Sequence, residues 1–306
     1  MKIKQTIPAE SRFTIMQFNE RFPDDDACLD WLMEKRYPGG IATCSYCHVD
    51  RKHHRITTKK AYACDYCGTY ISPMAGTIFE KSSTSLRLWF YAMYLMASTR
   101  CGVSAKQIQR ETGVTYKTAW RMFKQIRSML KEDVSNLGGP DSLGVEMDET
   151  YMGGVRKGVK GKPPASDKKK TAVVGIVERQ GRLRALVAKD TIGSTLLGMV
   201  KEHILPNTTV FTDEYRPYDG IGHMQNGYQH FRIKHSEKIY VVGDIHTNTV
   251  EGFWNLLKGG IRGVYHSVGK EYLQSYLNEY TFRYNRRRDT KPMFVSFLDQ
   301  VIAKAE

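Results

Sequence analysis

The segment LGVEMDETYM, residues 143–152, decides how the second half of this chain folds, because it predicts the first of several β-strands. Two further strands are predicted for TAVVGIVER (171–179) and RLRALVAKD (182–190), and the Gln-Gly pair between them is typical of a hairpin turn. STLLGMVKEHILP (194–206) predicts a helix that a proline ends, and TTVFTDEY (208–215) predicts a fourth strand. Strands interleaved with helices predict an α/β fold.

Two helices are predicted after these strands, and a linker before them. HTNTVEGFWNLLKGGIRG (246–263) begins one helix, and KEYLQSYLNEYTFRYNRR (270–287) has the amphipathic pattern of a longer one. The linker NLGGPDSLG, residues 136–144, is rich in Gly, Pro, Ser and Asp. We therefore expect residues 136–306 to form one domain.

Three smaller regions are expected upstream of the linker. Residues 1–38 predict a helical lead-in, in which Asp24, Asp25 and Asp26 are typical helix-start residues. Residues 39–80 are rich in Cys, Gly, Thr and Tyr and predict short strands and turns. Residues 81–135 predict helices.

The charge balance of the 306 residues favours a polyanionic partner. Lys and Arg number 46 and Asp and Glu number 32, which gives a formal net charge of +14. Each phosphate that a basic side chain neutralises releases condensed counterions, so such an excess is typical of nucleic-acid binding. The alternative is that the charge serves solubility alone.

The sequence predicts neither a membrane span nor a secreted protein. No run of about 18 apolar residues is present. The N-terminus MKIKQTIPAESRFT lacks the apolar stretch and cleavage site of a signal peptide. We therefore expect a protein of the reducing cytoplasm, where cysteines serve as metal ligands or buried thiols rather than as disulfides.

Four of the six cysteines form two CxxC pairs with 16 residues between the pairs. The predicted ligands are Cys44, Cys47, Cys64 and Cys67. Two such turns brought together by a hairpin supply the four thiolates that a tetrahedral Zn²⁺ binds. Because four cysteines complete the coordination, the predicted zinc is structural. The alternative is four unrelated cysteines.

The residues around these pairs carry two further expectations. Cys28 and Cys101 belong to no pair and are expected to be buried as small apolar side chains. A basic loop between the pairs is expected to face phosphate. Its cations are Arg51, Lys52, Arg55, Lys59 and Lys60.

Residues 104–130, SAKQIQRETGVTYKTAWRMFKQIRSML, resemble a helix-turn-helix. Ser104 and Thr115 are predicted N-caps, and Gly113 suits the turn between the two helices. The start of the second helix is where a recognition helix meets base edges. The residues expected there at the DNA are Thr115, Tyr116, Lys117 and Arg121. The alternative is a plain helical hairpin.

Three carboxylates lie where two-metal phosphodiester chemistry needs them. Asp148 and Asp213 are expected at the ends of the first and fourth strands, and Glu251 near the start of a helix. Two Mg²⁺ ions, held about 3.5–4 Å apart by converging acids, activate the attacking and leaving oxygens. Lys258 follows Glu251 by seven residues, or two helical turns, and can reach DNA from the same helix face. The alternative for each acid is a solvated surface charge.

Several neighbours leave alternatives open. Glu146 shares a strand face with Asp148 and can serve as a spare acid. Trp254 is expected to pack in the core, with stacking on a flipped base as the alternative. His246 and His266 flank the region; either can contact the substrate, although packing or exposure is expected for His266.

A basic segment, residues 155–170, lies between the first two strands and holds seven basic residues and one acidic residue. Its Gly and Pro content predicts a loop, and its cations can contact the DNA backbone. The residues expected to do so are Arg156, Lys157, Lys160 and Lys162. A solvated charge run is the alternative.

Residues 143–287 resemble the catalytic domain of DDE-type insertion-sequence transposases, in particular the zinc-ribbon subgroup of bacterial elements. The motifs that carry the resemblance, with the CxxC pairs, are MDETYMGG, TDEYRPYDG, HTNTVEGFWNLLKGGIRGVYH and YLNEYTFRYNRR. The resemblance implies a ribonuclease-H-like mixed sheet flanked by helices, preceded by a small zinc ribbon and a helical DNA-binding segment.

The resemblance also implies an activity and a set of site residues. Asp148, Asp213 and Glu251 would form the DDE triad, with Lys258 as the trailing basic residue. Some relatives have Asn in the third position, and Asn248 lies one helical turn before Glu251. We favour Glu251 as the ligand, since a carboxylate binds Mg²⁺ more strongly, and expect Asn248 to assist.

The expected reaction is cleavage at the ends of an element to give 3′-hydroxyls, followed by their attack on target DNA. Its expected cofactors are Mg²⁺ or Mn²⁺ at the acids, beside the structural Zn²⁺. Its expected partners are the terminal inverted repeats, the target DNA and at least one further copy of the chain, in the nucleoid of a bacterial cytoplasm. The alternatives are a zinc-ribbon regulator with an inactive nuclease-like domain, and a ribonuclease-H-like nuclease without strand transfer.

Overall fold

The computed structural model describes residues 12–131, 135–153, 170–225, 227–233 and 247–303. The chain divides into two compact units. One is formed by the residues up to Leu130 together with those from Asp289 onward, and the other by Lys131–Arg288. No helix among the described residues is long and apolar enough to cross a membrane.

The first unit begins with two capped helices. The Thr14 side chain accepts the Gln17 amide before α1 (Ile15–Arg21), and Asp24 accepts the Ala27 amide before α2 (Asp25–Arg36). These side chains satisfy amides that have no partner inside the helix. The helix start expected at the three aspartates is therefore confirmed.

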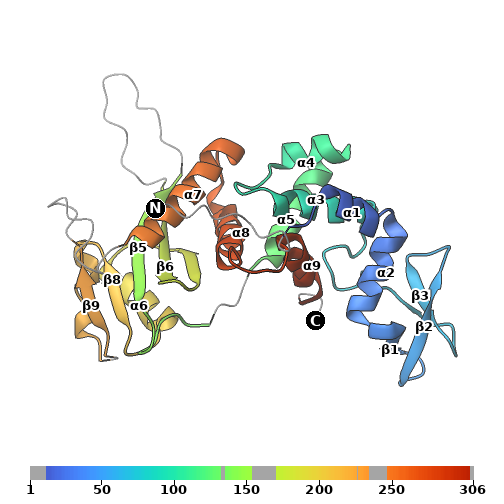
Figure 1. Cartoon of the computed structure of the whole chain (residues 1–306), viewed down its shortest axis with the longest axis horizontal. Helices are drawn as coiled ribbons and strands as arrows, with labels where there is room; N and C mark the ends of the chain where they lie inside the picture. Colours follow the sequence, from blue (N-terminus) through green and yellow to red (C-terminus); the bar gives the residue numbers. More distant parts are fainter. Residues whose placement is uncertain (1–11, 132–134, 154–169, 226, 234–246, 304–306) are drawn as a thin grey trace. The chain divides into compact units, whose positions relative to one another are not determined.

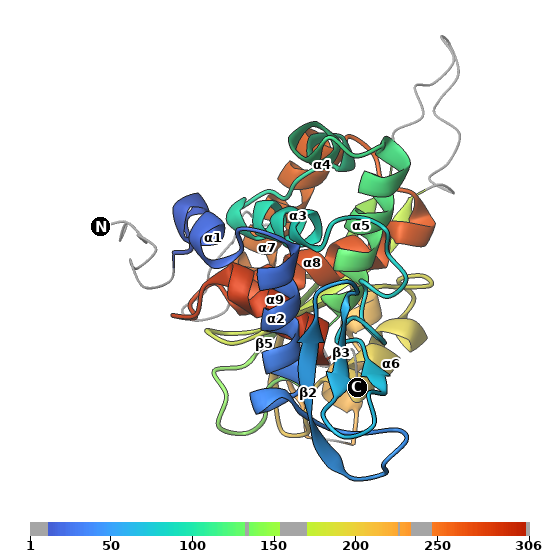
Figure 2. The ribbon, with the colours of Figure 1, turned by 90° about the vertical axis from the view of Figure 1, so that its right-hand side faces the viewer.

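A small antiparallel sheet follows, in the strand order β1-β2-β3-β4. Its strands are β1 (Ile41–Thr43), β2 (Asp50–Ile56), β3 (Ala61–Cys64) and β4 (Tyr70–Ile71). Figure 2 shows β2 and β3 beside α2. This sheet places the two CxxC pairs at neighbouring turns.

Helices complete the first unit: α3 (Leu86–Ser98), α4 (Ala105–Thr112), α5 (Tyr116–Met129) and the C-terminal α9 (Met293–Ala303). The ring of Phe294 in α9 lies 5.8 Å from that of Phe18 and 5.7 Å from that of Tyr94. This apolar packing joins the C-terminal segment to the first unit. We had expected residues 136–306 to form one domain, but the residues from Asp289 onward belong to the first unit.

The second unit is built on a five-stranded mixed sheet with the order β7-β6-β5-β8-β9. Its strands are β5 (Val145–Met152), β6 (Thr171–Glu178), β7 (Leu183–Val187), β8 (Thr209–Thr212) and β9 (Gln229–Arg232). β5, β6 and β7 pair antiparallel, whereas β8 and β9 run parallel to β5. β5, the strand of the opening segment, is thus at the centre of the sheet.

Helices cover both faces of this sheet (Figure 1). Apolar residues of β5 and β6 pack on one face against α6 (Gly193–His203). The other face packs against α7 (Asn248–Gly260) and α8 (Leu273–Asn285). Because β6 is covered on both sides, its residues are apolar without alternation. The expected α/β class, with a mixed sheet flanked by helices, is confirmed.

Of the two acids expected at strand ends, Asp148 lies elsewhere and Asp213 lies where it was expected. β5 continues to Met152, so Asp148 lies in the middle of the strand and not at its end. Asp213 follows β8 directly, which ends at Thr212. Because β5 and β8 are parallel neighbours, both acids reach the same part of the sheet.

Candidate functional site

The cysteine cluster, formed by Cys44, Cys47, Cys64 and Cys67, has all four Sγ atoms within 4.8 Å of one another. The Sγ atoms of Cys44 and Cys67 are 3.5 Å apart, and those of Cys47 and Cys64 are 4.0 Å apart. Sulfurs about 2.3 Å from one tetrahedral Zn²⁺ would lie about 3.8 Å from each other. The cluster therefore fits zinc, and the chain itself fills all four ligand positions.

The two cysteine turns share one backbone geometry. The amide of His48 donates to the Cys44 carbonyl at 2.9 Å, and the amide of Gly68 donates to the Cys64 carbonyl at 3.0 Å. Both donors lie in the left-handed region, with φ of 55° and 74°. The repeated CxxC spacing thus produces the same turn twice, which brings the sulfurs together.

The remaining cysteines differ from each other. Cys28 is buried as expected, but Cys101 is exposed, which corrects that expectation. Cys101 lies between α3 and α4, outside the packed core of the helices. Within the cluster, hydrogen bonds from Thr69 lower the pKa of Cys67, which favours the thiolate that binds metals.

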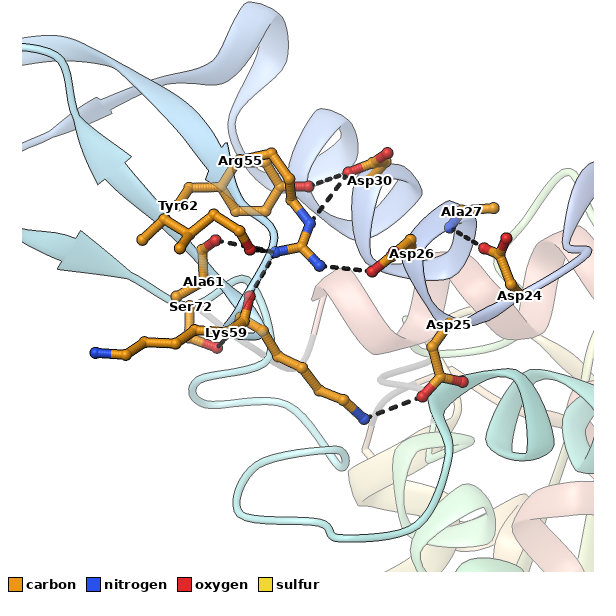
Figure 3. A network of polar contacts seen from close by, with 12 residues as sticks. Asp24, Asp25, Asp26, Ala27, Asp30, Arg55, Lys59, Ala61, Tyr62 and Ser72 are labelled. Carbon is orange, nitrogen blue, oxygen red and sulfur yellow. Dashed lines mark hydrogen bonds and ion pairs between the residues drawn. The ribbon is translucent and has the colours of Figure 1, made fainter.

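The basic residues between the cysteine pairs do not all face solvent (Figure 3). Arg55 donates to Asp26 at 2.6 Å, and its Nε lies 3.9 Å from Asp30. Lys60 lies 3.0 Å from Asp25. These two cations bind the acidic face of α2, so the expectation that they face phosphate is wrong.

The helix-turn-helix interpretation agrees with the geometry of α4 and α5. Gly113 ends α4 with φ of 71°, and the Thr115 side chain caps α5 by accepting the Thr118 amide. Tyr116 is 44% exposed, and the Lys106 ammonium lies 4.5 Å from its ring centre.

Two of the residues expected to contact DNA, Lys117 and Arg121, differ in how far their side chains are already engaged within the protein. Lys117 is exposed at the start of α5. The Arg121 guanidinium donates to the hydroxyls of Ser82 and Thr84 at 3.2 and 3.3 Å, so part of its donor capacity is already used inside the first unit.

The second unit contains a hollow of about 290 Å³, which we call the acidic hollow. It is lined by side chains of β5, the segment after β8, and α7, among them Asp148, Glu149, Asp213, Glu251, Asn255 and Lys258. The three acids and the lysine predicted from the sequence are therefore brought together, although more than 100 residues separate the first from the last.

A tryptophan of α7 holds the carboxylate of Asp148 by a hydrogen bond. The indole N–H of Trp254 donates to its Oδ2 at 2.8 Å. The strand neighbour of Asp148 is Gly175, where a Cβ atom would lie 2.6 Å from the indole ring. Trp254 is 4% exposed, so it packs in the core as expected, and its N–H fixes one oxygen of Asp148.

The electrostatics of Asp148 indicate a site that attracts cations. Burial raises its pKa to about 7, and the neighbouring charges of Glu149 and Asp213 add to this effect against the Trp254 hydrogen bond. Crowded carboxylates of this kind are stabilised in their ionised form by a bound cation.

Glu149 is a fourth acid that our sequence interpretation did not include. The Tyr218 hydroxyl donates to its Oε2 at 2.6 Å. Burial raises the pKa of Glu149, and the charge of Asp213 acts in the same direction. Its place next to Asp148 in the motif was the available signal, but strand alternation predicted the opposite face.

Asp213 lines the acidic hollow, and its carboxylate binds the backbone two residues further along the chain. Its Oδ1 accepts the Tyr215 amide at 2.9 Å. The hydroxyl of Thr191 lies 3.2 Å from that of Tyr215 and 2.8 Å from that of Tyr151. Tyr151 and Tyr215 are 50% and 37% exposed. Each tyrosine is close in sequence to one of the acids: Tyr151 lies on β5 three residues after Asp148, and Tyr215 lies two residues after Asp213.

α7 supplies the remaining predicted residues. Glu251 lies in its first turn, where the Thr247 hydroxyl donates to its Oε1 at 3.1 Å. Lys258 lines the acidic hollow two turns later. Asn248, the alternative third ligand, is exposed at the first position of α7 and is not among the lining residues.

The acidic hollow fits hard divalent cations, which prefer oxygen ligands. Its polar lining and several carboxylates meet that preference. Among the described residues, however, only the cysteine cluster has three or more potential metal-ligand atoms of His, Cys, Asp or Glu that all lie within 4.8 Å of one another. The carboxylates are therefore more widely spaced than the sulfurs.

Several predicted residues lie outside the described part of the chain: Arg156, Lys157, Lys160, Lys162 and His246. His266 is described. It is exposed, as expected, with φ of 61°, and its Nδ1 lies 3.1 Å from the carbonyl oxygen of Arg262.

Two family models match separate segments of the chain. The ISXO2-like transposase domain matches residues 137–285, and the transposase zinc-ribbon domain matches residues 23–70. A Halobacterium salinarum protein, described as an uncharacterized protein in transposable element ISH50, is 26% identical over 277 residues. That match covers 86% of this chain and 91% of the relative.

A shorter relative is an uncharacterized transposase-like protein of Haemophilus influenzae, 29% identical over 104 residues, or 34% of this chain and 81% of that protein. Among solved structures, the catalytic core domain of BIV integrase matches with a TM-score of 0.33 and 13% identity, over 56% of this chain and all of that one. A pre-cleavage Mos1 transpososome matches with a TM-score of 0.26 and 10% identity, over 71% of this chain and 79% of that one.

Proposed function

The chain belongs to the zinc-ribbon family of ISXO2-like DDE transposases, and from that premise we propose that it cuts DNA at the ends of a mobile element and joins the 3′-hydroxyls to target DNA. The observation that carries the proposal is the convergence of Asp148, Asp213, Glu251 and Lys258 on one acidic hollow. A solvated surface charge, the alternative for each acid, does not explain why side chains from β5, the segment after β8, and α7 meet there.

The acids act as ligands in this proposal. Asp148, Asp213 and Glu251 bind Mg²⁺ or Mn²⁺, and Glu149 adds charge beside them. Two such ions supply activation of the attacking oxygen and stabilisation of the leaving oxygen in both cleavage and transfer. Trp254 leaves one oxygen of Asp148 for a ligand role, because its N–H occupies the other.

The other residues hold DNA. Lys258 lies on the same face of α7 as Glu251 and contacts a phosphate next to the acids. Asn248 assists at the start of the helix. Tyr151 and Tyr215 pack against the nucleotide that flanks the scissile phosphate, since their rings are exposed and the two residues closely follow Asp148 and Asp213 in the sequence.

The first unit recognises the terminal repeats in this proposal. Thr115, Tyr116 and Lys117 at the start of α5 meet the DNA, as a recognition helix does. The cysteine cluster holds one structural Zn²⁺ and keeps the ribbon folded. The basic segment with Arg156, Lys157, Lys160 and Lys162 binds the DNA backbone, and two copies or more join two ends to one target.

A strand-transfer assay tests the function. The full chain is incubated with Mn²⁺, a supercoiled plasmid and a DNA end that carries the terminal repeat with a free 3′-hydroxyl. We expect a covalently joined product from the wild type and none from Asp148→Asn, which should still bind the repeat.

The same assay separates the two alternatives. A nuclease without transfer would nick DNA but leave the supplied 3′-hydroxyl unjoined. A regulator with an inactive domain would bind the repeat and do neither. Joining by Asp148→Asn at the wild-type rate would contradict the proposed role of the acidic hollow.

A further inference from the structure

Glu146 is a fully buried carboxylate two residues before Asp148 on β5. Strand alternation places both side chains on the face that α7 covers. Glu146 is not among the residues that line the acidic hollow. A buried ionised group requires partners that compensate for lost hydration, and the partners of Glu146 indicate its role.

The carboxylate of Glu146 binds the first turn of α7. Its Oε2 accepts the backbone amides of Thr249 and Val250 at 2.9 and 3.2 Å, and its Oε1 accepts the Thr249 hydroxyl at 2.8 Å. The first amides of a helix have no partner within it and carry partial positive charge. Thr247, at the N-cap position, makes no side-chain cap bond. Glu146 of β5 therefore performs the capping that a helix usually obtains from its own N-cap.

A second contact connects Glu146 to β8. The Arg179 Nε donates to Glu146 Oε1 at 3.2 Å. The Arg179 guanidinium lies 3.7 Å from the ring centre of Phe211, which is two residues before Asp213. Glu146 and Arg179 are 0% and 10% exposed, so water screens this ion pair little.

The contacts of Glu146 are close in sequence to all three proposed metal ligands. Glu146 precedes Asp148 by two residues, Val250 directly precedes Glu251, and Phe211 precedes Asp213 by two residues. The Glu146 carboxylate thus holds the start of α7 against β5. Through Arg179, it also connects these two elements to β8. A displacement at Glu146 would change the spacing of the acids themselves.

We propose that Glu146 is a positioning residue that holds α7 against β5 and so sets the separation of Glu251 from Asp148 across the acidic hollow. This inference rests on the proposed function. It replaces the interpretation of Glu146 as a spare acid, because its oxygens are engaged by α7 and Arg179 and not directed to the acidic hollow.

Three variants test the inference. Glu146→Gln keeps the size of the side chain but removes the charge. Thr249→Val keeps the shape of Thr249 and Glu146 itself but removes the hydroxyl donor. Thr249→Ser keeps the hydroxyl and is the matched control.

The first readout is structural. Hydrogen–deuterium exchange of the peptide that contains Thr249 and Val250 reports whether the two amides remain bonded. We expect exchange at least about tenfold faster in Glu146→Gln, a smaller increase in Thr249→Val, and no change in Thr249→Ser.

The second readout is the affinity for Mn²⁺, measured by calorimetry on the zinc-loaded full chain. Partners that orient ligands typically change metal affinity by about 10–100-fold. We expect a loss in this range for Glu146→Gln, a smaller one for Thr249→Val and none for Thr249→Ser. Asp148→Asn identifies which part of the binding belongs to the acidic hollow. High Mn²⁺ should restore much of the Glu146→Gln cleavage rate, because the ligands are present but misplaced.

The results that overturn the inference are distinct from those that overturn the function. Folded Glu146→Gln with wild-type amide exchange and wild-type Mn²⁺ affinity contradicts the positioning role alone. If Glu146→Gln does not fold, Thr249→Val decides: wild-type values in that variant contradict the role. A wild type that binds no Mn²⁺ and cuts no DNA contradicts the proposed function, and the inference with it.

Discussion

The cysteine cluster and the acidic hollow are two candidate metal sites built in opposite ways. The four sulfurs lie within 4.8 Å of one another on two similar turns of one small sheet. The carboxylates come from β5, the end of β8 and α7, and other side chains hold them: Trp254 on Asp148 and Tyr218 on Glu149. The first site is closed by its own ligands, whereas the second is an open hollow.

The difference teaches what each site needs. Thiolates around a structural zinc need only meet, and the metal then contributes to the stability of the fold. Carboxylates that act on a substrate must leave space between them for the metal ions and the substrate. Where such carboxylates are also buried, their like charges raise the free energy of the ionised forms. Hydrogen bonds from buried donors keep such groups in place before the metal arrives.

Loss of a zinc ligand should have the largest effect. Structural zinc contributes about 10–16 kcal/mol in small zinc-binding peptides, so Cys64→Ser should empty the site and unfold the ribbon. Zinc per chain should fall from one to near zero by mass spectrometry, and amide exchange of residues 41–71 should become fast. Cys101 is exposed and lies outside the cluster, so Cys101→Ser should change neither the zinc content nor the amide exchange. Full zinc content in Cys64→Ser would mean that the cluster is not the zinc site.

A ligand of the acidic hollow should have the next largest effect, on rate and not on folding. Glu251→Gln should slow strand transfer about 10³-fold, as expected when charge stabilisation in the transition state is lost. Asn248→Ala should slow it less than about tenfold, because Asn248 is exposed outside the lining and Glu251 lies within it. Single-turnover kinetics at equal protein loading measures both. The reverse order would identify Asn248 as the ligand.

Loss of the hydrogen bond from Trp254 to Asp148 should have a smaller effect than loss of a metal ligand. Trp254→Phe keeps most of the packing but removes the N–H that holds Oδ2, so Mn²⁺ affinity should fall about 10–100-fold. Calorimetry compares it with Trp31→Phe, whose buried indole N–H has no hydrogen-bond partner among the described residues. Equal affinities in the two variants would show that the Trp254 bond plays no part in the site.

The smallest effect concerns how the ribbon is attached to its neighbouring helices. Burial raises the pKa of Asp25, but hydrogen bonds from the Arg87 amide, Ser85 and Lys60 outweigh it and lower the pKa to about 2, below the ordinary 3.8. The ionised form therefore stabilises the fold above about pH 4, and this contribution disappears as the pH falls through about 2.

Asp25→Asn should thus destabilise the first unit at pH 7 by about 1–2 kcal/mol, after allowance for solvent screening. Urea unfolding followed by amide exchange in α2 and α3 measures the difference, which should shrink toward pH 2. Asp24→Asn is the control, because asparagine caps a helix as well as aspartate. A constant difference between pH 7 and pH 2 would contradict the assignment.

The two sites also differ in how far the sequence predicts them. The cysteine cluster depends on local spacing, so two CxxC pairs were sufficient to predict it. The convergence of Asp148, Asp213 and Glu251 depends on strand order, which no local motif predicts, and the family resemblance implied that these three residues act together. The partners of the acids were not predicted, because Trp254 and Tyr218 lie far from Asp148 and Glu149 in the sequence and reach them only in the packed fold.

Other differences have similar causes. The short strand β9 gave no distinct periodic pattern, and α9 was assigned to the catalytic region although its aromatic residues pack in the first unit. Arg55 and Lys60 were expected at DNA because charge alone does not indicate the acids on α2 that bind them. Partners far apart in sequence decided each of these outcomes.

Anomalous diffraction from a single crystal grown with Mn²⁺ tests the central claim most directly, because it locates zinc and manganese separately. We predict a zinc peak among the sulfurs of Cys44, Cys47, Cys64 and Cys67, and manganese between Asp148, Asp213 and Glu251. Manganese absent from the acidic hollow at saturating concentration, or those acids directed away from one another, would contradict the account.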